Sequence, residues 1–194
     1  MRHFLLIALV FSAVMAFAQE EQLIGDKIES GGFGGPTWKL TQLGGKTAIL
    51  DGGRGGWVIN HAFVLGGGGY GTQSDVKTDL LGPEGKPLYM GMDYSGLEIE
   101  YVHNSPRLVH WTVRSLFGGG KIRLNERDSP SRETVSDGFG VVDADFNVEL
   151  NVLRWLRVDA GAGYRLVFGI ETSGLSNSDI GGAFGQVTVK FGKF

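Results

Sequence analysis

The chain has 194 residues and a formal net charge of -3 at pH 7, with acidic and basic residues interspersed along its length. This charge pattern excludes a polybasic nucleic-acid surface and an acidic tail. Cysteine is absent, which excludes disulfides and thiolate metal sites. Glycine accounts for 33 of the 194 residues, more than twice its usual share of about 7%.

The N-terminal stretch MRHFLLIALVFSAVMAFA has a basic start, an apolar run from Phe4 to Ala16, and small residues at Ala16 and Ala18. This pattern predicts a secretory signal peptide, residues 1–18, that is cleaved before Gln19. The apolar run is shorter than the about 20 residues that a membrane-spanning helix needs. The remaining segment, 19–194, has the length of a single domain.

Residues 31–71 are rich in glycine interleaved with Trp, Phe, Tyr, Val and Ile, unlike a flexible linker. Gly66, Gly68 and Gly71 have the spacing G-x-G-x-x-G, but a dinucleotide loop must open a helix, and the residues that follow show no helical pattern. We interpret the segment as three strands, in which glycine allows tight curvature.

From about residue 31 onward the sequence alternates with a period of two, and in five segments after residue 95 this predicts strands with one apolar and one charged face. In the clearest segment, FGVVDADFNVELNV, apolar side chains at Val142 to Leu150 alternate with polar ones at Asp143 to Glu149. Together with the glycine-rich segments, the predicted strands number eight: 31–42, 47–59, 63–71, 96–103, 108–118, 139–150, 156–168 and 181–193.

The connections between these strands have lengths of about 4, 3, 24, 4, 20, 5 and 12 residues. Tight turns therefore alternate with long loops, as in an up-and-down barrel whose tight turns gather at one end. The predicted fold is all-β: an eight-stranded antiparallel up-and-down transmembrane β-barrel with both termini at the tight-turn end.

Two sets of residues favour an apolar face that points outward to lipid. The charged face carries carboxylates and cations that could pair across a narrow lumen: Glu98, Glu100, Arg114, Asp143, Asp145, Glu149, Arg157, Asp159 and Arg165. Aromatic residues near the tight-turn ends of the strands are typical of an interfacial girdle: Trp57, Phe63, Tyr101, Trp111, Trp155 and Phe191. A soluble periplasmic barrel of lipocalin shape, with the apolar face inside around a ligand, remains an alternative.

The signal peptide, the two-faced strands, the alternating connections and the terminal Phe194 together resemble the small outer-membrane barrels of Gram-negative bacteria, the OmpA and OmpX type. The glycine-rich pattern GGRGGWVIN and GGGGYG is also similar to that of bacterial outer-membrane proteins. This resemblance implies an outer-membrane location, contact with outer-membrane lipid, and periplasmic chaperones and the barrel-insertion machinery as partners during biogenesis.

In that family, a terminal Phe preceded by alternating apolar residues resembles an address for the insertion machinery. Here the series Val187, Val189 and Phe191 is out of step with Phe194. We expect a bulge near Gly192 to restore the phase.

Three sets of residues could suggest chemistry. His110 and Thr112, with Glu98 or Glu100, leave open a lipid-modifying enzyme that resembles a lipid A deacylase. The pairs Glu98/Glu100 and Asp143/Asp145 suit glycosidase chemistry only in their spacing of about 7 Å along a strand, and we interpret them as part of a charge network. The remaining histidines, His61 and His103, lie in turns without the spacing of a zinc site.

We therefore expect an integral outer-membrane protein whose polar lumen is plugged, because eight strands leave an interior that side chains fill. We expect no catalysis, no cofactor, no metal and no nucleic-acid partner, and a monomeric state. A structural or surface-interaction role would lie in the long connections 72–95 and 121–138, whose ligand the sequence does not identify.

Overall fold

The structure, a computed structural model, describes residues 29–82, 85–126 and 133–194, and describes no side chain at 133–134. The predicted signal peptide and its cleavage site lie outside these residues. The strands and one short helix are β1 (Ser30–Leu43), β2 (Lys46–Ile59), β3 (Phe63–Thr72), β4 (Val76–Leu81), β5 (Pro87–His103), β6 (Val109–Glu126), β7 (Glu133–Leu153), β8 (Leu156–Phe168), α2 (Asn177–Ile180) and β9 (Gly182–Lys193).

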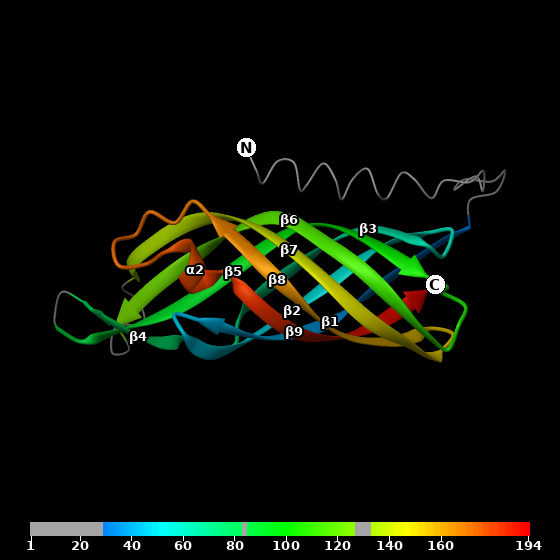
Figure 1. Cartoon of the computed structure of the whole chain (residues 1–194), viewed down its shortest axis with the longest axis horizontal. Coiled ribbons are helices and arrows are strands. Elements are labelled where there is room, and N and C mark those ends of the chain that lie inside the picture. Colours follow the sequence, from blue (N-terminus) through cyan, green and yellow to red (C-terminus); the bar gives the residue numbers. More distant parts are fainter. Residues whose placement is uncertain (1–28, 83–84, 127–132) are drawn as a thin grey trace.

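Neighbouring strands pair antiparallel in the order β3-β2-β1-β9-β8-β7-β6-β5-β4, and an additional pairing of β3 with β5 closes the sheet (Figure 1). The closed barrel therefore has eight strands, and β4 is a short extra strand hydrogen-bonded to β5 outside the ring. The predicted all-β barrel is confirmed.

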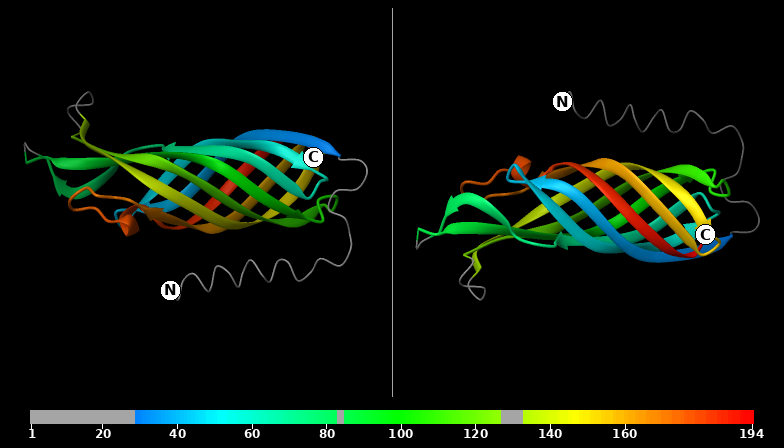
Figure 2. Two further views of the ribbon diagram at one scale, coloured as in Figure 1. Left: turned by 90° about the horizontal axis from the view of Figure 1, so that it is seen from above. Right: turned by 90° about the horizontal axis from the view of Figure 1, so that it is seen from below.

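The two ends of the barrel differ. One end, here called the turn end, carries the tight turns at residues 60–62, 104–108 and 154–155, together with the C-terminus (Figure 1). The opposite loop end carries β4, α2 and the β1–β2 turn at Gly44 and Gly45, and strands there project well beyond the rest of the barrel (Figure 2).

Large apolar side chains cover the outside of the barrel. On β7, Phe146, Val148 and Leu150 are 52%, 49% and 41% exposed, whereas Asn147 and Glu149, which alternate with them, are buried. The apolar face thus points away from the lumen. The alternative of a lipocalin-like barrel with this face inside is wrong.

Three strands are longer than the sequence predicted. β5 begins at Pro87, β6 runs to Glu126 and β7 begins at Glu133, so much of the two predicted long loops is strand. The alternation continues there, but its phase is reversed: Leu88, Met90, Met92, Ile122 and Leu124 point inward and are buried. The outward apolar pattern stops where the phase reverses, and for this reason the strands predicted from the sequence are too short.

The interior of the barrel is layered along its axis. At the turn end lies a small apolar group, here called the mouth cluster: Phe33, Val58, Val64, Val102 and Phe194. At the loop end lies a larger one, the outer cluster: Leu43, Ala48, Leu50, Tyr70, Leu88, Met90, Met92, Tyr94, Leu116, Ile122, Leu124, Phe139, Val141 and Ile180. Buried charged side chains fill the length of lumen between the two.

Candidate functional site

The buried charges of the lumen form a connected set, here called the lumen network. Its carboxylates are Glu98, Glu100, Asp143, Asp145, Glu149 and Asp159, and its cations are Lys39, Arg54, Arg114, Arg157, Arg165 and Lys190. All nine predicted lumen residues belong to it, and six carboxylates face six basic side chains. A buried charge is tolerated only with a partner, so this balance matters for stability.

Arg54 joins two carboxylates that lie two residues apart on β5. Its Nε donates to Glu98 Oε2 at 2.6 Å, and its Nη2 donates to Glu100 Oε2 at 2.7 Å. The glycines around it on β2 let the backbones approach: a Cβ at Gly52 would overlap the carbonyl oxygen of Gly69 on β3. The close approach of the glycine-rich strands β2 and β3 therefore lets Arg54 reach Glu98 and Glu100 on β5.

Lys190 on β9 is shared by three carboxylates nearer the turn end. Its Nζ lies 2.9 Å from Glu100 Oε1 and 3.1 Å from Asp159 Oδ2, and it also pairs with Glu149. Glu149 in turn accepts from Arg157 Nη1 at 2.9 Å. One buried ammonium thus contacts carboxylates on three different strands.

Arg114 and its partners form the centre of the network. Its Nη2 donates to Asp145 Oδ2 at 2.8 Å and to Gln186 Oε1, and its Nη1 donates to the Tyr70 hydroxyl at 3.3 Å. The same Tyr70 hydroxyl donates to Glu98 Oε1 at 2.9 Å, which links this centre to Arg54.

Lys39 closes the network on the loop-end side. Its Nζ donates to Asp143 Oδ2 at 2.6 Å and lies 3.7 Å from the centre of the Tyr70 ring. Arg165 Nε is 3.5 Å from Asp143 Oδ1, and its Nη1 donates to the Ile180 carbonyl at 3.1 Å. Charge here is stabilised by aromatic faces as well as by carboxylates.

The sequence prediction missed three of the six cations, Lys39, Arg54 and Lys190. Lys190 shares its strand phase with the polar Gln186 and Thr188, opposite Val187 and Val189, so phase alone could have placed it. Arg54 and Lys39 lie in the glycine-rich part of the chain, where the alternation is weak. These two cations can be assigned to their carboxylates only when the pairing of the strands is known.

The six predicted girdle residues point outward near the turn end. Trp57, Trp155 and Phe191 are about half exposed, and rings of Phe63, Tyr101 and Trp111 neighbour one another at 5.3 and 5.7 Å. Further exposed aromatics, which the sequence prediction did not single out, lie farther toward the loop end on the same outer surface: Trp38, Phe117, Tyr164 and Phe168.

The histidine set proposed for lipid chemistry is not assembled. His110 Nε2 lies 2.9 Å from Glu149 Oε1, and its Nδ1 faces the Arg107 carbonyl at 3.1 Å. The Thr112 hydroxyl instead accepts from Asn147 Nδ2 at 3.4 Å. Both side chains face the lumen and are buried, away from the outer surface where a lipid would lie.

The remaining motifs have structural roles. Gly66, Gly68 and Gly71 all lie within β3, so they open no helix. His103 stacks on Trp111 at 4.6 Å, and His61 pairs with Glu29 at the turn end. Within the described ranges, no group of three or more His, Cys, Asp or Glu side chains could hold a metal ion.

The terminal Phe194 points inward, which corrects the expectation of a bulge near Gly192. The β1–β9 register is unbroken from Gly32↔Lys193 to Thr41↔Phe184. Phe194 therefore has the inward phase, and its ring lies 5.9 Å from Phe33 and 4.1 Å from the Arg157 guanidinium. The mismatch with Val187 and Phe191 arises because these residues face outward and Phe194 closes the lumen at the turn end.

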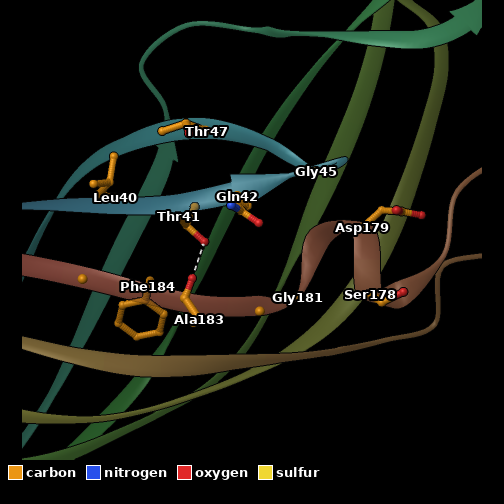
Figure 3. A pocket seen from close by; sticks show the side chains of 12 residues that line it. Leu40, Thr41, Gln42, Gly45, Thr47, Ser178, Asp179, Gly181, Ala183 and Phe184 are labelled. Carbon is orange, nitrogen blue, oxygen red and sulfur yellow. Dashed lines mark hydrogen bonds between the residues drawn. The ribbon is translucent and has the colours of Figure 1, made fainter.

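A recess of about 650 Å³ lies on the outer surface, between the β1–β2 turn and α2 (Figure 3). Leu40, Gln42 and Thr47 form one side of it, and Ser178 and Asp179 the other. The Asp179 carboxylate already accepts from Ser176, in the capping box of α2. The recess thus has little free charge with which to select a ligand.

No protein-family model matches the chain, and no curated protein matches it by sequence. No helix among the described residues is long and apolar enough to cross a membrane.

Solved structures match the fold over most of its length. Neisserial surface protein A is 10% identical, with a TM-score of 0.56 over 87% of this chain and 100% of that one. The N-terminal β-barrel domain of Pseudomonas aeruginosa OprF is 13% identical, with a TM-score of 0.50 over 84% and 96%. Ail, the attachment invasion locus protein of Yersinia pestis, is 14% identical, with a TM-score of 0.50 over 84% and 95%.

The chain therefore has the fold of the small eight-stranded outer-membrane barrels, as the resemblance to the OmpA and OmpX type implied. Identities of 10 to 14% carry the fold alone.

Proposed function

We propose that this chain is an integral outer-membrane protein with a closed lumen, and that it acts through its loop end rather than through transport or catalysis. The observation that carries the proposal is the direction of its amphipathicity: apolar side chains cover the outside, and paired charges lie inside. In water this arrangement would expose a wide apolar surface, whereas in a bilayer it matches the hydrocarbon.

Backbone hydrogen bonding supports the same placement. The β3–β5 pairing closes the sheet, so the ring has no open edge at the level of the apolar belt. Only a closed barrel or a helix satisfies every backbone group inside hydrocarbon. The predicted signal peptide supplies the export step, and we propose periplasmic chaperones and the barrel-insertion machinery as partners during assembly.

The layered interior supports a lumen that does not conduct. An ion that crosses the barrel would have to pass the mouth cluster, break ion pairs of the lumen network and then pass the outer cluster. Each step exposes apolar side chains or separates buried charges, and both are costly. We propose that the network stabilises the barrel and performs no chemistry.

The loop end supports a surface-interaction role. There the phase reversal leaves polar side chains such as Asp93, Lys121 and Arg123 on the outside of β5 and β6 and apolar ones within. The outer surface of the strands at this end is therefore suited to contact with water. Two proteins of the same fold are named a surface protein and an attachment invasion locus protein, which is consistent with such a role.

The test is fractionation of expressing cells, followed by an alkaline carbonate wash and denaturing electrophoresis with and without boiling. We expect the chain in the washed outer-membrane fraction, and a band that migrates faster before boiling than after it, because a closed barrel resists detergent at room temperature. Recovery in the soluble periplasm with a single mobility would overturn the proposal. We expect a monomer by crosslinking in the same membranes.

A further inference from the structure

A shallow recess of about 440 Å³ lies across β3, β5 and β6. Its outward-facing members are glycines, one serine and three charged residues: Gly69, Gly71, Ser95, Gly119, Asp93, Lys121 and Arg123. The strand register places them side by side, since Gly69 pairs with Ser95, Ser95 with Gly119, and Asp93 with Lys121.

The floor of this recess is bare backbone. Packing against neighbouring strands does not require glycine at every position of the floor. A Cβ at Gly69 would meet Ser95 Cβ at 3.6 Å, which is an ordinary contact. At Gly119 a Cβ would lie 3.0 Å from the Phe139 carbonyl oxygen, a tighter fit. A side chain would therefore fit at residue 69. Because this residue is glycine, a ligand could approach the backbone of β3 closely.

The recess lies where the outer surface changes from apolar to charged. On the turn-end side, Leu97 and Phe117 follow in the same outward phase and are 75% and 51% exposed. On the loop-end side, the next outward residues are Asp93 and Lys121. In a membrane this change marks the upper limit of the hydrocarbon.

The loop-end rim of the recess is cationic. Arg123 Nη2 pairs with Asp93, and both side chains remain about half exposed. Lys121 is exposed and makes no ion pair with any residue that the structure describes. The rim therefore offers an ammonium group without an ion pair beside a guanidinium that has further N–H donors, although the Asp93 and Asp51 carboxylates lie in the same row of the register.

We propose that this recess binds a membrane lipid with a phosphate-bearing headgroup. The phosphate would lie between Lys121 and Arg123, and an acyl chain would cross the bare floor at Gly69, Ser95 and Gly119 toward Leu97 and Phe117. A phosphate accepts charge-assisted hydrogen bonds from both cations, and the apolar side chains below suit hydrocarbon. The cationic rim alone would suit any anion, and the apolar side chains alone would suit any hydrocarbon; a phospholipid uses both.

The proposal rests on the proposed membrane placement and goes beyond it, because a barrel can span a membrane without selecting any lipid. A free anion would use the cations but would have no use for the apolar side chains and the open floor. The recess therefore favours a lipid over inorganic phosphate.

The experiment places the folded chain in nanodiscs of phosphatidylcholine with a small fraction of phosphatidic acid, and counts retained lipids by native mass spectrometry. We expect preferential retention of one phosphatidic acid. Lys121→Gln should weaken it about fivefold, because a cation near a membrane surface contributes on the order of 1 kcal/mol. Lys77→Gln, a matched control at an exposed lysine on β4, should leave retention unchanged.

Ser95→Phe tests the apolar half. The side chain at residue 95 is exposed, so the larger ring should fill the recess without disturbing the lumen. We expect it to reduce retention of phosphatidic acid, while added inorganic phosphate should not displace the lipid from the unmodified chain. Equal losses for Lys121→Gln and Lys77→Gln, full displacement by phosphate, or no effect of Ser95→Phe would overturn the proposal.

The two levels of proposal fail differently. A chain that enters nanodiscs and shows the heat-dependent mobility but retains no phosphatidic acid refutes the lipid site alone. A chain that does not enter nanodiscs refutes the membrane placement.

Discussion

At the scale of single residues, the lumen is held together by cations that each serve several acceptors. Arg114 is the clearest case, because its guanidinium reaches Asp145, Gln186 and Tyr70 from one buried position. Such groups are costly to bury, and their partners would be more costly to leave alone. Removal of one partner is therefore a stronger perturbation than removal of a pair.

Arg114→Ala should lower the free energy of unfolding by about 3–5 kcal/mol, because it leaves the Asp145 carboxylate buried without a cation. Urea titration of the barrel in lipid vesicles measures this change. Val113→Ala, which alters an outward side chain on the same strand, is the matched control and should have a much smaller effect. A near-neutral Arg114→Ala would show that water fills the lumen.

Asp137 on the projecting part of β7 holds the segment before α2. Its Oδ2 accepts from the Glu171 N–H at 2.8 Å and from the Thr172 N–H and hydroxyl at 2.9 Å. These hydrogen bonds, that from Glu171 first, lower the pKa of Asp137. Because the pKa is lowered in the folded state, the contribution is complete above the ordinary Asp value of about 3.9 and is lost as the pH falls through the folded-state pKa.

We therefore expect Asp137→Asn to speed amide hydrogen exchange at Glu171 and Thr172 at neutral pH. In the unmodified chain, protection should decline only in acid, below about pH 4. Asp51→Asn, at an exposed position on β2, should leave both amides unchanged. Equal protection in Asp137→Asn and the unmodified chain would mean that the carboxylate does not hold this segment.

At the scale of elements, the long strands β5, β6 and β7 each change their apolar face partway along. Below the change, Leu97 and Phe117 face outward; above it, Met92 and Ile122 face inward. Glycines lie at this level, and at Gly96 and Gly118 a Cβ would overlap backbone of the neighbouring strand. Under the proposed membrane placement, each of these strands would face lipid below the change and water above it.

Leu124→Lys should disrupt only the projecting part, because Leu124 belongs to the outer cluster and is 2% exposed. We expect hydrogen-exchange protection to fall at residues 87–92 and 122–126, while the heat-dependent mobility of the barrel persists. Lys121→Ala, an outward change three residues earlier, should preserve protection. Loss of the mobility shift in Leu124→Lys would show that the two parts fold as one unit.

At the scale of the whole molecule, two apolar clusters enclose the lumen network along the barrel axis. The clusters exclude water from the charges, which strengthens each ion pair and raises the cost of breaking one. The C-terminal residue takes part, since Phe194 packs on Phe33 and Arg157. The interior resembles the core of a soluble protein divided by a charged layer.

We expect the purified chain to show no discrete conductance steps in planar bilayers. The reason is the sequence of barriers along the axis, each of which requires exposure of apolar side chains or separation of buried charges. The mobility shift on the same sample confirms that the barrel is folded. Regular steps of one size would contradict a closed lumen.

The sequence by itself predicted the all-β barrel and strands with one apolar and one charged face, and it favoured an outward apolar face without deciding it. Strict alternation at residues such as Phe146 and Asp145 separates the two faces, because a strand turns successive side chains to opposite sides. The six aromatics that the sequence predicted as a girdle stay a prediction.

Only the tertiary structure decided which face of the sheet lies inside, how the charges pair, where the strands end and which way Phe194 points. Arg54 meets Glu98 and Glu100 from a distant strand, and that contact depends on register, which a weakly patterned glycine segment does not specify. The recess at Lys121 likewise exists because the strand register places Gly69 of β3 and Gly119 of β6 on either side of Ser95. Alternation is a property of one strand, whereas partners, register and depth along the barrel axis belong to the closed sheet.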